Sequence, residues 1–221
     1  MDVHIWSDVV CPWCYLGKRR FEHALEQFEH RGEVQVHHRS FQLDPSKPRH
    51  QTASRRAMLK AKYHLSDQQV QEMDTKMERL AAAEGLEFHL TDAGVTGNTL
   101  DAHQILHLAR GRGTQDSVLE RLYRAYFTEQ RSVFDRDSLV PLAVEGGLDA
   151  DEARDALERD AYVDAVNTDL NEARSLGISG VPFFVIAGRY DISGAQGTEV
   201  FAQALTRAQQ DTVTASGPAR S

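Results

Sequence analysis

Cys11 and Cys14 are the only cysteines of this 221-residue chain, and they lie three positions apart. They follow a short apolar stretch and open a segment in which apolar residues recur at helical spacing. A thiol at the start of a helix faces unpaired backbone N–H groups and the positive end of the helix dipole, which favours its thiolate. We therefore expect Cys11 to be a nucleophile. Cys14, one turn further along, is placed to attack a mixed disulfide formed at Cys11, so the predicted chemistry is thiol–disulfide exchange.

The same spacing also occurs in zinc sites, which normally need four ligands. With two cysteines, such a site requires two histidines, and among the ten histidines only His103 and His107 share a helix face at a spacing of four. No third ligand of fixed spacing accompanies them, so we expect a solvated or core-lining helix face and no metal. Two buried structural cysteines are a further alternative. Pro12 weighs against both, because proline suits the first helical turn and lets the helix begin at Cys11.

The charge of the chain argues against some classes of binding partner. The formal net charge is −8, and no basic tract is dense enough to bind a nucleic acid or an anionic membrane. The densest basic run, Lys18-Arg19-Arg20, is expected to form a solvated helix face. The N-terminus lacks the features of a secretory signal, and no apolar stretch approaches the roughly 20 residues that span a bilayer. We expect a cytoplasmic protein, where disulfides are usually transient and catalytic.

Hydrophobic spacing predicts the order of the elements. A short buried strand over residues 3–7 is followed by a helix over 12–30, with Gly32 as its stop, and by a second strand over 34–41. A strand–helix–strand unit of this kind implies parallel neighbouring strands joined by a right-handed crossover. The pattern then changes to helices alone, with candidates over 53–63, 67–85, 98–111, 115–130, 137–146 and 150–175, the last broken near Asp160.

Strand character returns near the C-terminus. Residues 183–186 and 190–193 fit a hairpin with Gly188 at its turn, and a last helix is predicted over 198–209. The small polar residues that follow predict a disordered tail. The expected domains are a discontinuous unit of residues 1–50 and 176–211, an all-helical insertion of residues 51–175 and a tail of residues 212–221.

This order, and two end motifs, resemble a known family. The segment from Ser7 to Glu22, which contains Cys11-Pro12-Trp13-Cys14, resembles the FrnE-like branch of the DsbA family of thiol–disulfide oxidoreductases. Residues 177–186 resemble the second signature of that family, and Ser193-Gly194-Ala195-Gln196 continues it. The resemblance covers roughly residues 3 to 210. It implies an α/β, thioredoxin-like fold with a mixed sheet of about four strands and a large all-helical insertion.

The resemblance also implies that Val181–Pro182 is a cis peptide bond lying against the dithiol. A substrate chain could then pair with the backbone of Val181 in the manner of an added strand. An ordinary trans proline that opens an edge strand is the alternative. The implied substrate-binding residues are therefore Pro12, Trp13, Val181 and Pro182, beside the catalytic Cys11 and Cys14.

Three further side chains each allow two interpretations. Trp13 is either an exposed apolar platform for substrate or a residue that packs against the insertion. Asp8 is either a loop cap, which we favour, or a proton acceptor near Cys14. Asn98 is expected to cap a helix rather than to contact substrate directly.

Several functions fit these features. The favoured one is a thiol–disulfide oxidoreductase that acts on thiol- or disulfide-containing proteins or small molecules and exchanges electrons with a cellular redox partner. Trp13 supplies neither a proton nor a cation, whereas periplasmic members of the family carry histidine there, so a milder couple is expected. The alternatives are a glutathione-dependent enzyme of the 2-hydroxychromene-2-carboxylate isomerase or kappa-class transferase type, a polyketide tailoring enzyme, and a chaperone-like binding module. No cofactor is expected, unless glutathione serves as reductant or co-substrate.

Overall fold

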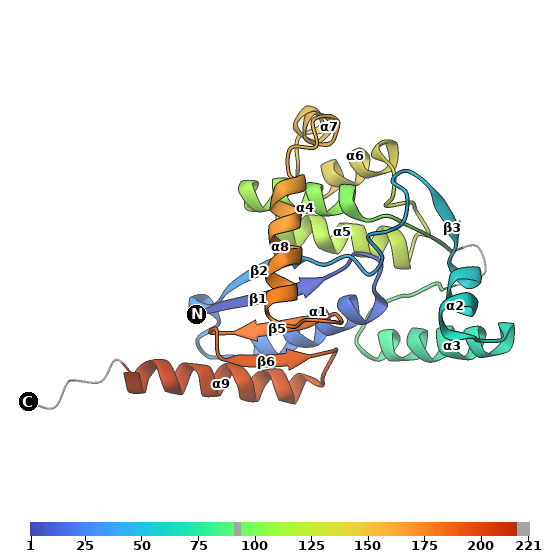
Figure 1. The fold of residues 1–221 in the computed structure, drawn as a ribbon. Coiled ribbons are helices and arrows are strands. Elements are labelled where there is room, and N and C mark those ends of the chain that lie inside the picture. Colours follow the sequence, from blue (N-terminus) through green and yellow to red (C-terminus); the bar gives the residue numbers. More distant parts are fainter. Residues whose placement is uncertain (91–93, 216–221) are drawn as a thin grey trace, which may run out of the picture.

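The two ends of the chain build one four-stranded mixed sheet (Figure 1). The computed structural model describes residues 1–90 and 94–215. In the order β2-β1-β5-β6, the strands are β2 (Gln35–Ser40), β1 (Asp2–Ser7), β5 (Phe183–Ile186) and β6 (Tyr190–Ser193). In this sheet, β1 pairs with β2 in parallel and with β5 antiparallel, and β5 and β6 form an antiparallel hairpin. This confirms the predicted thioredoxin-like α/β sheet.

Alternating residues of β1 point into different layers, because successive side chains of a strand face opposite sides of the sheet. Val3 and Ile5 join an apolar cluster with α1 (Pro12–Glu26) and α9 (Thr198–Ala215). Trp6 belongs to a separate cluster on the other face, where its Nε1 donates to the backbone oxygen of Asp169 in α8 at 3.2 Å. β1 is therefore packed against apolar side chains on both of its faces.

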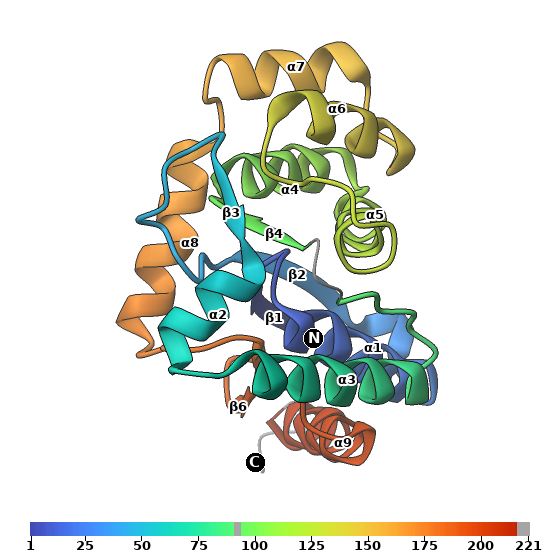
Figure 2. The same cartoon turned by 90° about the vertical axis from the view of Figure 1, so that its right-hand side faces the viewer.

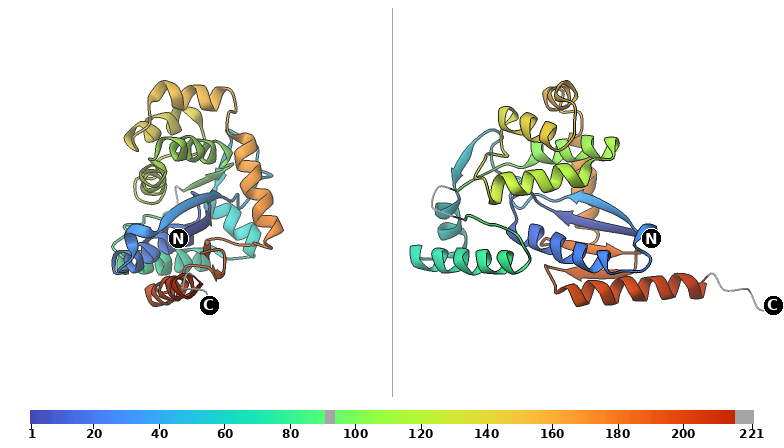
Figure 3. Two further views of the ribbon diagram at one scale, coloured as in Figure 1. Left: turned by 90° about the vertical axis from the view of Figure 1, so that its left-hand side faces the viewer. Right: turned by 180° about the vertical axis from the view of Figure 1, so that it is seen from behind.

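The block between β2 and β5 is mainly helical: α4 to α7 lie on the side of the sheet opposite α9, whereas α3 lies beside α1 (Figures 2 and 3). The expected break near Asp160 separates α7 from α8, and Asp160 has a positive φ of 52°. In chain order, the helices are α2 (Arg55–Tyr63), α3 (Asp67–Ala83), α4 (Leu100–Arg112), α5 (Gln115–Phe127), α6 (Arg136–Glu145), α7 (Ala150–Glu158) and α8 (Val163–Ser175).

The inserted block is not all-helical, contrary to the expectation from sequence. Two three-residue strands, β3 (Thr52–Ser54) and β4 (Val95–Gly97), pair antiparallel within it. A Cβ added to Gly97 would lie 2.8 Å from the ring of Phe134, so glycine lets β4 closely approach the segment that precedes α6. Strands this short leave no alternation in the sequence, which is why helical spacing dominated the prediction.

Two helix ends also differ from the prediction. The first helix ends at Glu26, and a short 3-10 turn, Arg31–Glu33, connects it to β2. The last helix, α9, continues to Ala215 instead of ending near Gln209. Residues 212–215 of the expected disordered tail are thus helical, and residues 216–221 lie outside the described residues.

The N-terminus and the C-terminal end of α9 lie at the same end of the molecule (Figures 1 and 3). Within residues 1–90 and 94–215, none of the helices has both the length and the apolar character that crossing a bilayer demands.

Although α8 falls inside the block expected to be an insertion, it packs against β2 of the central sheet.

Candidate active site

Cys11 occupies the N-cap position of α1, and the helix begins at Pro12 as the sequence predicted. The backbone N–H of Cys11 donates to the carbonyl of Asp8 at 3.1 Å, which closes the turn leading from β1 into the helix. The sulfur of Cys11 lies 3.7 Å from the carbonyl oxygen of Val181. Both cysteines are free thiols, and Cys11 is 4% exposed. The structure thus brings the two predicted motifs together at one point.

The peptide bond between Val181 and Pro182 is cis, as the resemblance implied. Gly194 donates its N–H to the carbonyl of Pro182 at 2.8 Å, which ties this loop to the end of β6. Gly17 lies against the same loop, since an added Cβ would come within 2.9 Å of Pro182 Cγ. The sequence analysis assigned no role to Gly17, although a glycine inside a helix is a signal of close approach.

Cys14 is more deeply placed than Cys11, at 1% exposure. Burial raises the pKa of the Cys14 thiol well above its ordinary value, and the hydrogen bond with Cys11 raises it further. Backbone hydrogen bonding from Asp8 acts in the opposite direction, and the charge of the Asp8 carboxylate again raises the pKa. Cys14 is therefore held as a neutral thiol, and it must lose its proton before it can attack a disulfide.

Asp8 is buried at 1% exposure beneath the dithiol. Its Oδ2 accepts from the backbone N–H of Leu43 at 2.8 Å, so the carboxylate anchors the loop after β2. Its Oδ1 lies 3.4 Å from Nε2 of His103 on α4. The expected capping role accounts for Oδ2 only, and the proximity to Cys14 keeps the proton-acceptor interpretation open.

Trp13 is 44% exposed, which argues against the interpretation that it packs into the insertion. Leu43, on the loop held by Asp8, is also exposed, at 39%. The sequence analysis missed Leu43, because a single leucine in a loop carries no recognisable pattern. Exposed large apolar side chains next to a reactive group are typical of a substrate-binding surface.

The two histidines of α4 lie next to different carboxylates. His103 faces Asp8, whereas Nε2 of His107 lies 3.1 Å from Asp169 Oδ2 and 3.1 Å from Ser40 Oγ. Both rings are buried, as a core-lining helix face would be. Across residues 1–90 and 94–215, His, Cys, Asp and Glu side chains form no group of three or more that could hold a metal ion.

Asn98 acts as the expected cap, although Thr99 is the geometric N-cap residue of α4. Its Oδ1 accepts from the N–H of Leu100 at 2.9 Å and from Gln42 Nε2 at 3.2 Å, and its Nδ2 donates to the carbonyl of Lys47 at 2.7 Å. Asn98 therefore also holds the loop after β2 in place.

The basic run on α1 is not simply a solvated face, because Lys18 is only 3% exposed. Its ammonium binds Glu22 on the same helix and two carboxylates of α5, those of Asp116 and Glu120, at 3.1 and 3.0 Å. Burial alone would lower the pKa of Lys18, but these carboxylates raise it overall. The partners come from 100 residues further along the chain, which the sequence could not reveal.

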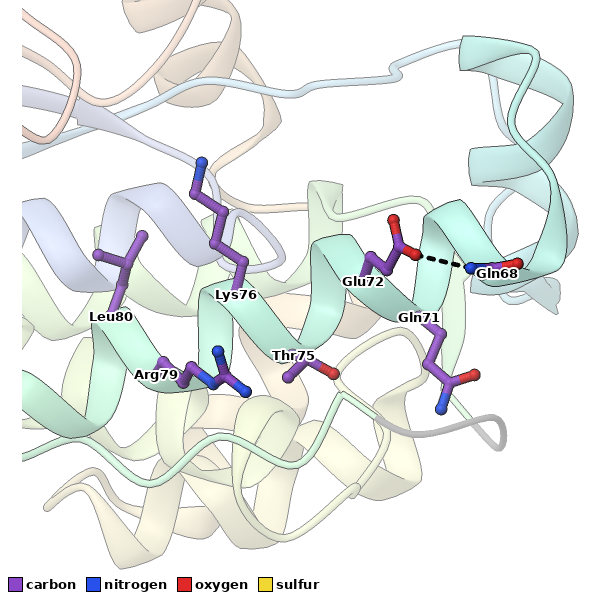
Figure 4. Close-up of a pocket in the computed structure, with 7 residues that line it drawn as sticks. All are labelled: Gln68, Gln71, Glu72, Thr75, Lys76, Arg79 and Leu80. Carbon is purple, nitrogen blue, oxygen red and sulfur yellow. Dashed lines mark hydrogen bonds between the residues drawn. The ribbon is translucent and has the colours of Figure 1, made fainter.

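A hollow of about 630 Å³ lies along α3, and its lining includes none of these groups (Figure 4). All of its lining side chains come from that one helix, and Gln68 donates to Glu72, one turn further along it, at 2.9 Å. The lining contains no cysteine or histidine, so the hollow offers no group for thiol chemistry. The lining residues are Gln68, Gln71, Glu72, Thr75, Lys76, Arg79 and Leu80.

A cysteine pair at the start of α1, with a cis-proline loop against it, defines a protein of the thioredoxin-fold class that carries a CxxC motif. Residues 2–206 match the family described as DSBA-like thioredoxin domain, and the chain belongs to that family.

Three individual proteins are similar to this chain over nearly its whole length. The crystal structure of the probable DsbA oxidoreductase SCO1869 from Streptomyces coelicolor is 47% identical, with a TM-score of 0.91 over 100% of this chain and 93% of that one. The uncharacterized protein YwbO of Bacillus subtilis (strain 168) is 32% identical over 95% of this chain and 99% of its own. The cytosolic disulfide reductase DsbM from Pseudomonas aeruginosa, solved with GSH, is 18% identical, with a TM-score of 0.61 over 97% and 98% of the two chains.

Proposed function

We propose that the protein is a thiol–disulfide oxidoreductase that acts through the Cys11-Pro12-Trp13-Cys14 motif. One observation carries the proposal: Cys11 begins α1 with its sulfur 3.7 Å from the Val181 carbonyl, while Cys14 lies deeper in the same helix as a buried thiol. Cys11 is the N-cap residue of α1, where the first backbone N–H groups of a helix have no partner within the helix. Membership of the DSBA-like family and the likeness to SCO1869 support the same chemistry.

In the oxidising direction, a substrate thiolate attacks the sulfur of Cys11 in the Cys11–Cys14 disulfide. The S–S bond breaks, Cys14 leaves with the electron pair and takes up a proton, and a mixed disulfide joins Cys11 to the substrate. A second substrate thiolate then attacks the substrate sulfur and releases Cys11 as a thiolate. The protein gains two electrons, and the substrate gains one disulfide. Reduction of a substrate disulfide is the reverse sequence.

The substrate is proposed to lie across Trp13, Leu43 and the loop of Val181 and Pro182. The Val181 backbone beside Cys11 offers a place for an extended peptide to pair. The exposed Trp13 ring would pack against apolar atoms of the substrate next to the attacked sulfur. Pro12 adds a partly exposed apolar ring to the same surface. Both protein and small-thiol substrates fit this arrangement.

The proposed compartment is the cytoplasm, with glutathione or a protein dithiol as the redox partner. Support comes from the use of only two cysteines, both in the reactive motif, and from the fold shared with DsbM, a cytosolic disulfide reductase solved with GSH. Trp13 between the cysteines supports a disulfide that is only a mild oxidant. Whether the protein oxidises or reduces its substrates would then depend on the redox state of the cellular thiols.

The test compares the wild type with Cys11→Ser and Cys14→Ser in insulin reduction and in refolding of scrambled ribonuclease. We expect both activities to vanish in Cys11→Ser. In Cys14→Ser we expect mixed disulfides to accumulate, because the resolving thiol is gone. Equal behaviour of all three proteins contradicts the proposal.

A glutathione-dependent isomerase needs no resolving thiol. Isomerisation of a chromene carboxylate that requires glutathione and persists in Cys14→Ser would therefore support that alternative instead. A chaperone-like function would be indicated if suppression of aggregation persisted in Cys11→Ser.

A further inference from the structure

Three buried polar atoms of one residue pair beneath the dithiol lack hydrogen-bond partners among the described residues. They are Oδ1 of Asp8 and both ring nitrogens of His103, and the hydroxyl of Tyr123, near Cys14 and Asp8, is a fourth such atom. The two side chains are each 1% exposed, and Asp8 Oδ1 and His103 Nε2 lie 3.4 Å apart, slightly beyond a good hydrogen bond. Unsatisfied polar atoms are rare in protein interiors because each one is costly, so a group of three at one place calls for an explanation.

A second pair on the same helix shows what a purely structural arrangement looks like. One turn after His103, His107 lies 3.1 Å from Asp169 and also reaches Ser40 Oγ. Asp169 in turn accepts from the N–H of Ser40 at 2.8 Å and from Arg39 at 3.0 Å. The polar atoms of that pair are satisfied by neighbours from β2. The Asp8–His103 pair keeps unused hydrogen-bonding capacity, and it is the pair that adjoins Cys14.

We propose that His103 is a positioning residue which, through the Asp8 carboxylate, holds the proton that Cys14 exchanges with the interior during each cycle. The inference rests on the proposed thiol–disulfide exchange and assigns the inserted helix α4 a part in it. His103 touches no reacting sulfur and acts only through Asp8.

The proton balance is simple. When the disulfide closes, the Cys14 S–H bond breaks, its proton passes to the Asp8–His103 pair, and the sulfur attacks Cys11 and expels the substrate thiolate. When the disulfide opens, Cys14 leaves as a thiolate and recovers a proton from the pair. A buried thiol has no direct access to water, so an internal group must carry this proton, and a carboxylate next to an imidazole is the kind of pair that performs general acid–base chemistry.

Other titratable groups surround Asp8 and belong to the same electrostatic environment. Cys11 and Cys14 face it from α1, Tyr123 and Tyr126 from α5, and Lys47 from the loop after β2. Burial and the charges of Cys14, Cys11 and Asp8 raise the pKa of Tyr123 well above its ordinary value, so its hydroxyl stays protonated. Among the groups named, His103 is the only imidazole.

The test uses reduced protein and dithiobis-nitrobenzoate, an aromatic disulfide that releases a coloured thiolate at each step. Attack by Cys11 releases the first equivalent, and attack by Cys14 on the mixed disulfide releases the second. In Asp8→Asn and His103→Gln we expect the second phase to slow by about tenfold or more, and its pH dependence to change, with the first phase within about twofold of wild type.

His107→Gln is the matched control, since it changes the same residue type on the same helix, one turn away. We expect it to leave both phases within about twofold of wild type. An unchanged second phase in both Asp8→Asn and His103→Gln overturns the proposal, and so does an equal slowing in His107→Gln. Absence of both phases in the wild type would instead refute the thiol exchange itself.

Should the variants at Asp8 or His103 fail to fold, the wild type answers the question. In protein with isotopically labelled histidine, we expect the titration of His103 to differ between the dithiol and disulfide forms, while that of His107 stays the same. Identical titration of His103 in the two forms would rule the proposal out.

Discussion

Gly17 lies directly against Pro182, with a missing Cβ that would fall 2.9 Å from the proline Cγ and 3.4 Å from Ala195 Cβ. The contact joins the helix of the dithiol to the loop whose Val181 carbonyl faces Cys11. Because a proline ring cannot turn aside as a long flexible side chain can, the separation between helix and loop depends on the absence of a side chain at position 17.

Gly17→Ala is therefore expected to destabilise the protein by about 1–3 kcal/mol through overpacking, even though alanine is the better helix former. Denaturant unfolding measures this, and insulin reduction should fall with it. Gly32→Ala is the control, since an added Cβ there meets nothing within 4 Å. Equal stability of both variants would show that the loop adjusts freely.

Alkylation should discriminate between the cysteines. Burial raises the pKa of Cys14, so its thiolate fraction is small at neutral pH and grows only as the pH rises. We expect limiting iodoacetamide near pH 7 to modify Cys11 first, as read by peptide mapping. Preferential modification of Cys14 would reverse the assigned roles of nucleophile and resolving thiol.

Trp13→Ala should weaken substrate binding without loosening the fold. The ring is 44% exposed, so its removal should change stability by less than about 0.5 kcal/mol. We expect KM for a peptide disulfide to rise severalfold. The control is Tyr63→Ala on α2, whose ring is 54% exposed. The same KM in Trp13→Ala as in wild type would remove Trp13 from the substrate surface.

Asp169 should make stability depend on acid pH. Burial alone would raise its pKa, but the hydrogen bonds with His107 and the Ser40 backbone lower it below the ordinary value of 3.8. A depressed folded pKa means that the stabilisation is complete above the unfolded value and is lost as the pH falls through the folded one. We expect stability measured from pH 6 to pH 3 to fall less in Asp169→Asn than in wild type.

At neutral pH the same variant should be less stable by about 3–5 kcal/mol, because Arg39 and His107 lose their shared partner. Asp137→Asn, at an exposed position of α6, is the control, and its stability should depend on pH as that of the wild type does. If Asp169→Asn had the same stability as the wild type at every pH, these contacts would contribute nothing to folding.

Sequence patterns were sufficient where the signal is local. The strands of the sheet follow from runs of β-branched and aromatic residues, and the start of α1 follows from Pro12. Cysteine spacing alone predicts the reactive pair, and the structure places both cysteines at the start of α1. These features depend on residues that are neighbours in the chain.

The rest depends on partners far apart in sequence. Asp8 meets His103, and Lys18 meets Asp116, only after the inserted helices have folded onto the sheet. Helix α4 is buried almost throughout, so its polar residues do not mark a solvent-facing side as they would on an amphipathic helix. No periodicity in the chain could identify these pairs.

The polar contacts of α4 also limit how the protein can be re-engineered. A chimera that took its helical block from a relative would leave Asp8 as a buried charge beside a foreign side chain in place of His103, and would leave Arg39 and Ser40 of β2 without Asp169. Position 8 must therefore be matched to position 103, and positions 39 and 40 to position 169, when the two parts are combined.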